Sequence, residues 1–212
     1  MKLVEMNLKE FNDEIDSSSP APGGGSVSAL ASSIGVSLSR MVGHLTVKKK
    51  KFRALDIEIQ NKFNTILEDF VIMKSELISL VDKDTEAFNL IMKAFKMPKE
   101  TDEDKKNRKD KILEGTIEAI KVPFIVAELS YKALENMEFI LKHGNKNTLS
   151  DIGVSTLMIY SGLEGAILNV KINIPGLTDQ HLINQYQDSV SEMLLQAKRM
   201  KDSILGKIHN TL

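Results

Sequence analysis

Asp84 has the sequence surroundings of a carboxyl group that can exchange protons near neutral pH. At the three- and four-residue spacing of a helix, its neighbours are apolar, among them Leu77, Val81 and Phe88. Burial among such groups disfavours the charged carboxylate and raises its pKa, which suits a general acid or base. Asp82 shares its face with polar residues, and we expect it to be solvated. The alternative for Asp84 is a structural carboxylate paired with a lysine or arginine of another helix.

A proline- and glycine-rich segment, residues 20–26 (PAPGGGS), opens a long run of small and aliphatic residues. Prolines favour an extended approach, and Gly23, Gly24 and Gly25 allow the backbone to come close to another group. Ser26 is expected to cap the helix that follows. The free N–H groups and positive dipole of such a helix start form a candidate anion site, although an ordinary turn before a helix is the alternative.

Charged residues at two predicted helix ends allow both a structural and a binding interpretation. Lysines 48–51 follow the small-residue helix. They either interact favourably with the negative C-terminal end of the helix dipole or bind a polyanionic ligand tail. No aromatic residues alternate with these lysines, so we expect no nucleic-acid partner. Asp151 falls in the first turn of a later predicted helix, where the dipole favours a negative charge.

Two predicted helices have faces built from small residues. One is the helix after the glycine-rich segment, and the other is near residues 150–174. On the second, one face carries Gly162, Gly165, Ala166, Asn169 and Asn173. Close packing of helices explains such faces. A flat ligand lying against the surface is the alternative, which the asparagines favour because buried amides need hydrogen-bond partners.

Apolar residues recur at helical spacing along nearly the whole chain, and no alternating β pattern stands between turn signals. The sequence therefore predicts an all-α fold, a multihelical bundle of about seven helices with one long helix and no sheet, in a single domain over residues 1–212. After a short helix capped by Asn7, the expected helices are 26–47, 52–95, 101–122, 123–143, 150–174 and 178–212, with caps at Thr101, Ser150 and Thr178 and a left-handed stop at Gly144.

Composition excludes several classes of protein. The net charge of -1 provides no global field for nucleic acid or a membrane surface, and there are no cysteines for disulfides or thiolate metal sites. The four histidines lack metal-ligand spacing, so we expect no metal and no redox cofactor. Residues 1–11 lack the apolar core of a secretory signal, and no run is long and apolar enough to span a membrane. We expect a cytoplasmic protein.

Four sequence segments occur together and in order over most of the chain. They are 20–26 (PAPGGGS), 41–52 (MVGHLTVKKKKF), 80–88 (LVDKDTEAF), and 150–154 (SDIGV) leading to 165–173 (GAILNVKIN). In this combination they resemble the folate cyclodeaminase/cyclohydrolase family, which includes the cyclodeaminase domain of formiminotransferase-cyclodeaminase and the single-domain methenyltetrahydrofolate cyclohydrolases. The chain departs from the family pattern at Lys48, where glycine is common, and at Ser155, where alanine is common.

The resemblance implies an all-helical enzyme that forms a homodimer or a larger homo-oligomer. Its substrate would be a tetrahydrofolate derivative, reacting at the carbon that bridges N5 and N10, and no cofactor would be permanently bound. By resemblance, Asp84 is the catalytic aspartate. Substrate contacts are expected from the glycine-rich helix start and the lysines, which would hold the glutamate carboxylates, and from the asparagines at the pterin edge: Gly23, Gly24, Gly25, Ser26, Lys49, Lys50, Asp151, Asn169 and Asn173.

Two reactions fit this site. In the cyclodeaminase reaction, which we favour, N10 of 5-formiminotetrahydrofolate attacks the formimino carbon and ammonia leaves, forming the 5,10-methenyl bridge. The alternative is methenyltetrahydrofolate cyclohydrolase, in which water opens that bridge to 10-formyltetrahydrofolate. A second alternative is a non-catalytic helical module that binds folate or serves oligomerisation.

Overall fold

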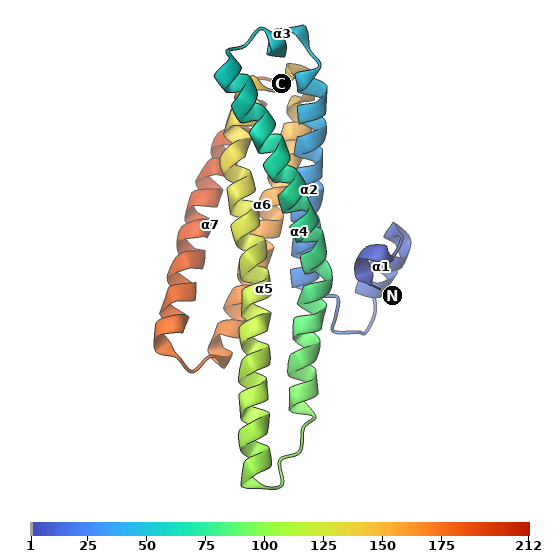
Figure 1. Ribbon diagram of the computed structural model, residues 1–212, viewed down its shortest axis with the longest axis vertical. Coiled ribbons are helices and arrows are strands. Elements are labelled where there is room, and N and C mark those ends of the chain that lie inside the picture. The colour runs from blue at the N-terminus through green and yellow to red at the C-terminus, as the bar shows by residue number, and fades with distance from the viewer. Residues whose placement is uncertain (1) are drawn as a thin grey trace.

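Helix-forming segments occupy most of the chain, and the turns between them are short. The computed structural model describes residues 2–212, in which there are seven α-helices, three 3₁₀-helices and no strand (Figure 1). The α-helices are α1 (Leu8–Ile15), α2 (Gly24–Val47), α3 (Lys50–Arg53), α4 (Ile57–Phe95), α5 (Asp102–His143), α6 (Leu149–Asn173) and α7 (Gln180–His209), and the 3₁₀-helices are η1 (Leu3–Glu5), η2 (Lys146–Thr148) and η3 (Ile174–Gly176). The prediction of an all-helical bundle is confirmed.

Four helices form the core of the bundle. α2 packs between α4 and α6, while α5 packs against α4 and α6 on the other side. α7 lies along α5 and α6, and α1 lies to one side of the four core helices, with its Phe11 buried (Figure 1). α2 runs antiparallel to α4, because Gly25 meets Asp84 near one end of the pair and Gly43 meets Leu67 near the other. None of the helices described in residues 2–212 is long and apolar enough to cross a membrane.

The small-residue faces of α2 and α6 pack directly against each other. A side chain at Gly35 would collide with Ile159, and one at Gly162 would collide with Ser32. The hydroxyl of Ser155 donates a 2.7 Å hydrogen bond to the Gly35 carbonyl oxygen across this contact. Close helix packing therefore accounts for most of these two faces, and it fixes α6 antiparallel to α2.

Besides its small-residue face, α2 carries a stripe of apolar residues at helical spacing, and part of this stripe faces outward. Val27, Ile34 and Met41 are each more than a third exposed, while most of the small residues of α2 are buried. α6, beside α2, adds Val154, Leu157, Leu168 and Ile172, all exposed. We call the exposed apolar side chains of these two helices the α2–α6 face: Val27, Ile34, Met41, Leu45, Val154, Leu157, Leu168 and Ile172.

Two predicted helix boundaries are wrong. The expected helix 52–95 is two helices, because α3 ends at Arg53 and α4 begins only at Ile57. The expected break before Pro123 is absent, and α5 continues through it. A proline inside a helix leaves the carbonyl four residues earlier without its N–H partner. Here Asn173 donates a 3.2 Å hydrogen bond from Nδ2 to that carbonyl, at Ala119, which helps to explain why the helix tolerates the proline.

The predicted caps are partly confirmed. Asn7 and Thr101 cap α1 and α5 as expected, each in a capping box. Ser26 is not a cap, since α2 begins at Gly24 and Gly23 holds the N-cap position. Ser150 and Thr178 were expected to be N-caps, and neither is. The N-cap residue is Thr148 for α6 and Asp179 for α7. Gly144 ends α5 with φ of -72°, so the stop is extended and not left-handed.

Candidate active site

The start of α2 holds the carboxyl group of Asp84. The backbone N–H of Ser26 donates a 2.9 Å hydrogen bond to Oδ2 of Asp84. The Ser26 hydroxyl lies 3.2 Å from the same oxygen and 2.8 Å from the Val81 carbonyl oxygen, so its one proton can serve either acceptor. The glycine-rich helix start was expected to attract an anion, and a carboxyl side chain of the chain itself occupies part of that position.

Glycine at positions 24 and 25 makes this arrangement possible. A Cβ atom at Gly25 would overlap the Asp84 carboxyl group, and one at Gly24 would lie 2.9 Å from Nδ2 of Asn169. Three helices therefore meet at this point: α2 supplies the two glycines and Ser26, α4 supplies Asp84, and α6 supplies Asn169. We call these five residues the Asp84 cluster.

The environment of Asp84 favours its neutral form. Burial raises the pKa of the carboxyl group above its ordinary value of 3.8, and the two hydrogen bonds from Ser26 oppose that change to a smaller extent. The side chain is still only partly buried. A carboxyl group that is reachable from solvent and has a raised pKa is suited to donate and accept protons near neutral pH. The alternative of a buried ion pair is wrong for residues 2–212, whose ion pairs do not include Asp84.

Asp82 was expected to be solvated, and this prediction is wrong. Its Oδ1 accepts a 2.7 Å hydrogen bond from the backbone N–H of Leu3, and the side chain is partly buried. Asp82 therefore anchors η1 to α4, two residues away from the Asp84 cluster. The polar residues at helical spacing around Asp82 could not indicate this contact, because Leu3 is 79 residues away in sequence.

The two asparagines of α6 have different surroundings. Asn169 is in the Asp84 cluster, where its Nδ2 also donates a 2.8 Å hydrogen bond to the Gly165 carbonyl oxygen. Asn173 lies one turn further along, and its Nδ2 donates to the carbonyl oxygens of Ala119 and Asn169. Asn173 thus has a structural role at Pro123, and its contact with a ligand stays a prediction.

Lys49, Lys50 and Asp151 lie far from the Asp84 cluster within one chain. α2 has 24 residues, and at about 1.5 Å per residue it separates its two ends by roughly 35 Å. Both lysines lie just beyond the distal end of α2, and Asp151 lies in the first turn of α6 at that same end. A cavity of about 560 Å³ is lined there by Lys49, Lys50 and Lys51 among others. The single chain therefore divides the predicted site residues into two groups.

The fold and the Asp84 cluster define an all-helical class of protein in which one partly buried carboxyl group is held at a glycine-rich helix start. Comparison with known proteins specifies the family. Residues 7–192 match the family described as formiminotransferase-cyclodeaminase. The chain belongs to that family.

The relatives of this chain fall into two size classes. The methenyltetrahydrofolate cyclohydrolase of Methylorubrum extorquens is 33% identical over 93% of this chain and 93% of its own length. The formimidoyltransferase-cyclodeaminase of Rattus norvegicus is 32% identical over 97% of this chain, which spans only 37% of that protein. The structure of a formiminotetrahydrofolate cyclodeaminase from Thermotoga maritima has the same fold, with a TM-score of 0.78 at 24% identity over 98% of this chain and 96% of that one.

Proposed function

We propose that this protein is a folate one-carbon enzyme that acts on the N5–N10 bridge, and that it is a 5-formiminotetrahydrofolate cyclodeaminase. The observation that carries the proposal is the Asp84 carboxyl group, partly buried, raised in pKa and held against Gly25 by Ser26. Membership in the formiminotransferase-cyclodeaminase family supplies the substrate class. Cyclodeaminase relatives match 97% of this chain, which supports the choice of reaction.

Asp84 provides the proton transfers that the reaction requires. The substrate reacts with its formimino group protonated (CH=NH₂⁺). N10 attacks the formimino carbon, whose nitrogen becomes an NH₂ group, and the carboxylate accepts the N10 proton as the new C–N bond forms. The resulting carboxylic acid then returns a proton to the formimino nitrogen, which leaves as ammonia, and the 5,10-methenyl cation remains. Ser26 holds one carboxyl oxygen throughout, so the other oxygen, Oδ1, is the one we assign to the substrate. Positioned acid–base catalysis of this kind contributes about 10² to 10⁴ in rate.

A second candidate is the methenyltetrahydrofolate cyclohydrolase reaction. It is favoured by the relative of that name, which matches this chain over 93% of both lengths. In that reaction Asp84 takes a proton from water as the water oxygen bonds to the bridge carbon. The C–N5 bond then breaks, N5 gains a proton, and 10-formyltetrahydrofolate is the product.

An absorbance assay on the purified protein distinguishes the two reactions. If the protein is a cyclodeaminase, the methenyl compound accumulates from 5-formiminotetrahydrofolate, and one equivalent of ammonia is released. Faster loss of added methenyl compound, without any turnover of the formimino substrate, would instead identify a cyclohydrolase. Absence of both activities would contradict the proposal and leave a non-catalytic folate-binding or oligomerisation module.

The proposal includes a homodimer formed through the α2–α6 face. This face places Ile34 at 46% and Ile172 at 76% exposure on two adjacent helices, and a contiguous exposed apolar surface of this kind marks an interface. A two-fold axis is the commonest symmetry for such a contact, and it pairs the same surface of both copies. The Asp84 cluster lies beside this face, because Val27 and Leu168 adjoin Ser26 and Asn169 in sequence and are both exposed.

A dimer of this form also accounts for the distant lysines. The exposed apolar residues of α2 run from Val27 to Leu45, and their midpoint is Val36. A two-fold axis perpendicular to α2 at that level places Lys49 of one copy opposite Gly23 of the other, since each is thirteen residues from Val36. Lys49, Lys50 and Asp151 would then reach the substrate bound at the partner's cluster. The lysines would hold the glutamate carboxylates, and Asn169 would hold the pterin edge.

No permanently bound cofactor is needed, because the folate substrate itself carries the one-carbon unit and the chemistry is proton transfer. A cytoplasmic location is proposed from the sequence alone, since its lack of cysteine is compatible with a reducing compartment.

A further inference from the structure

The Ser26 hydroxyl group has more hydrogen-bond partners than it has protons. Its oxygen lies 2.8 Å from the Val81 carbonyl oxygen, 3.2 Å from Oδ2 of Asp84 and 3.3 Å from the Thr85 hydroxyl oxygen. Ser26 is fully buried, so water cannot replace a partner that is lost. A serine hydroxyl group supplies one proton and two lone pairs. The proton therefore has two acceptors to choose between, and the oxygen can accept a bond from Thr85.

Thr85 completes this arrangement from α4. It follows Asp84 in sequence and its side chain is partly buried. Because the proton of Ser26 points to a carbonyl or a carboxyl oxygen, Thr85 is the donor in the pair of hydroxyl groups. The bond from Thr85 uses a lone pair of Ser26, so the Ser26 proton stays free to turn between its two acceptors.

The two acceptors of Ser26 respond differently to the charge of Asp84. An ionised carboxylate accepts a stronger hydrogen bond than a neutral carbonyl group, so ionised Asp84 attracts the hydroxyl proton to Oδ2. When Asp84 takes up a proton at Oδ1, Oδ2 becomes an uncharged oxygen. The Val81 carbonyl oxygen is then the closer of two neutral acceptors. A backbone carbonyl oxygen has two lone pairs, so Val81 accepts this bond within an intact helix.

We propose that Ser26 is a positioning residue whose hydroxyl group donates to Oδ2 of Asp84 when the carboxyl group is ionised and turns to the Val81 carbonyl oxygen when it is protonated. The hydroxyl group keeps its own proton, and only the direction of its O–H bond changes. Neither state leaves the buried hydroxyl group without an acceptor, which would be costly. The inference rests on the proposed function, because it adds a group that supports the proton transfers assigned to Asp84.

Charged side chains do not compete with Ser26 for Asp84. Residues 24–39 of α2 carry no charge. In η1, Glu5 accepts a hydrogen bond from the backbone N–H of Lys2, and Asp82 is bonded to the η1 backbone. The other adjoining helices carry six charged residues near the cluster in sequence, and none forms an ion pair with Asp84 in residues 2–212: Lys83 and Glu86 on α4, Glu118 and Lys121 on α5, and Glu164 and Lys171 on α6.

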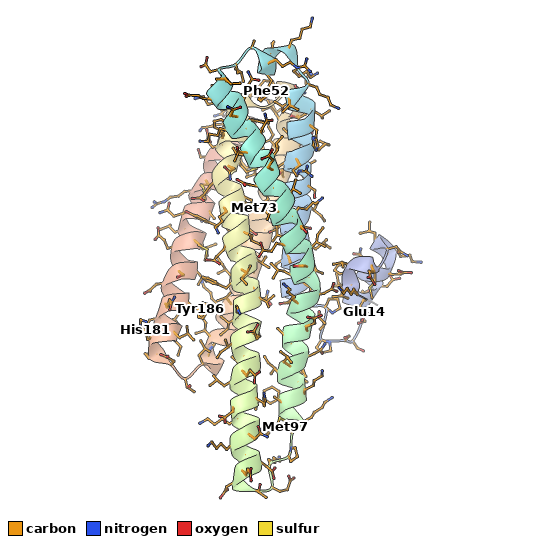
Figure 2. All side chains as sticks on the ribbon, in the orientation of Figure 1. Glu14, Phe52, Met73, Met97, His181 and Tyr186 are labelled. Atoms are coloured by element: carbon orange, nitrogen blue, oxygen red, sulfur yellow. The ribbon has the colours of Figure 1, made fainter. Side chains whose placement is uncertain are left out.

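The lysines beyond α2 are too distant to act on Asp84 in the same chain. Figure 2 shows Phe52, which follows them in sequence, at one end of the bundle and Met97 toward the other end. The part of α4 between its start at Ile57 and Asp84 is about 40 Å long at the usual helical rise. In the proposed dimer, the lysines of the second copy would act equally on the wild type and on variants of Ser26. Differences between these proteins therefore report on the hydroxyl group.

Titration of the Asp84 carboxyl group measures the effect of Ser26 without any folate. Carboxyl-carbon NMR of aspartate-labelled protein follows the resonances over a pH series, and Asp84→Asn identifies the one that belongs to Asp84. Ser26→Ala removes a hydrogen bond to the ionised form, so the pKa of Asp84 should be higher than in the wild type. Thr85→Val should raise the pKa of Asp84 by a smaller amount. Ser33→Ala is the matched control, because this buried α2 serine bonds the Leu30 carbonyl oxygen, and it should leave the titration unchanged.

Steady-state kinetics connect the hydroxyl group to turnover. The acid limb of kcat/KM reports the ionisation of the free enzyme, so it should move to higher pH in Ser26→Ala. On that acid side, kcat/KM should fall by roughly tenfold, since one hydrogen bond to a charged group is lost. Ser33→Ala should keep the wild-type profile. Ser26→Cys retains a weak donor and should lie between Ser26→Ala and the wild type, and it provides the comparison if Ser26→Ala fails to fold.

The outcomes separate this inference from the proposed function. An unchanged Asp84 titration in folded Ser26→Ala, or an equal shift in Ser33→Ala, would overturn the inference. An unchanged titration in Thr85→Val would contradict the role of Thr85 as a donor. A titration that shifts as expected, in a protein that turns over neither folate substrate, would contradict the proposed function while the contact between Ser26 and Asp84 stands.

Discussion

Both hydrogen bonds from Ser26 to Asp84 end on the same oxygen, Oδ2, whereas Gly25 adjoins the other oxygen, Oδ1. The hydrogen bonds found among residues 2–212 include none to Oδ1, so one carboxyl oxygen is fixed by the protein and the other is available to carry a proton. Because Gly25 has no side chain, the α2 backbone can come this close to the carboxyl group. The glycine-rich segment thus positions the proposed catalytic acid.

Gly25→Ala should abolish most activity without unfolding the protein. A methyl group at this position overlaps the Asp84 carboxyl group, so the side chain must move away from Ser26. Gly206→Ala is the matched control, because a methyl group there has no atom within 4 Å. Steady-state kinetics and circular dichroism of both variants check this prediction. Equal activity of the two variants would mean that the close approach of Gly25 has no role in catalysis.

The free energy of unfolding of Asp84→Asn, relative to that of the wild type, should increase as pH rises. Because the folded state raises the pKa of Asp84 above 3.8, folding favours the protonated group, and that stabilisation is lost as pH increases through the folded-state pKa. The asparagine variant does not titrate, so its advantage in the free energy of unfolding should grow toward neutral pH. Urea unfolding over a pH series, at one protein concentration, measures this difference.

For Asp104 the pH dependence of stability has the opposite sign, so the same substitution there serves as the control. Hydrogen bonds from Thr101 lower the pKa of its exposed carboxyl group, so its stabilising effect is present at neutral pH and is lost on acidification. Asp104→Asn should therefore lose stability at neutral pH and approach the wild type in acid. If the two variants followed the same pH trend, the assigned environment of Asp84 would be wrong.

Asn173→Ala should lower the free energy of unfolding by about 1–3 kcal/mol, because the Ala119 carbonyl group loses its donor. In a Pro123→Ala background the cost should shrink, since residue 123 regains an N–H for that carbonyl. A double-mutant cycle by urea unfolding measures the coupling. Asn136→Ala, which removes an exposed amide bonded within its own helix, is the control. Additive effects of the substitutions at 123 and 173 would show that the two residues are not coupled.

Mixing two inactive variants tests whether Lys49 and Lys50 serve the partner's site. Asp84→Asn and Lys49→Ala/Lys50→Ala chains, unfolded and refolded together, should recover about a quarter of wild-type activity, because half of the dimers are mixed and each has one intact site. Asp84→Asn mixed with Gly25→Ala should recover nothing, since both changes affect the same cluster. Failure of the first mixture to exceed its two components would place the lysines in another role.

Local patterns in the sequence predicted much of the fold. Helical periodicity and the caps at Asn7 and Thr101 depend on nearby residues, and the structure confirms them. Pro123 misled the prediction because its cost is reduced by Asn173, 50 residues further along the chain, which no local pattern encodes. The apolar stripe of α2 was equally ambiguous: helical spacing shows that Val27, Ile34 and Met41 share a face, but not whether that face lies inside the chain or on its surface.

The candidate site could be predicted only in part for the same reason. The apolar neighbours of Asp84 identified the carboxyl group, and the glycines identified a close approach. The contact between these two features depends on the tertiary structure, which local sequence patterns do not encode. The same is true of the separation between the cluster and Lys49, which is about 35 Å at the usual helical rise. Asp82 and Asp84 also show that helical face alone does not decide burial, because η1 covers the more polar of the two.

Turnover of 5-formiminotetrahydrofolate by Asp84→Asn is the most direct test of the account. The variant should fold and bind folate normally, while kcat for methenyl formation and ammonia release falls by about 10² to 10⁴ because the proton carrier is gone. Asp82→Asn, two residues away and outside the cluster, should keep kcat close to the wild-type value. Wild-type kcat in a correctly folded Asp84→Asn protein would contradict the assignment of Asp84 as the catalytic acid and base.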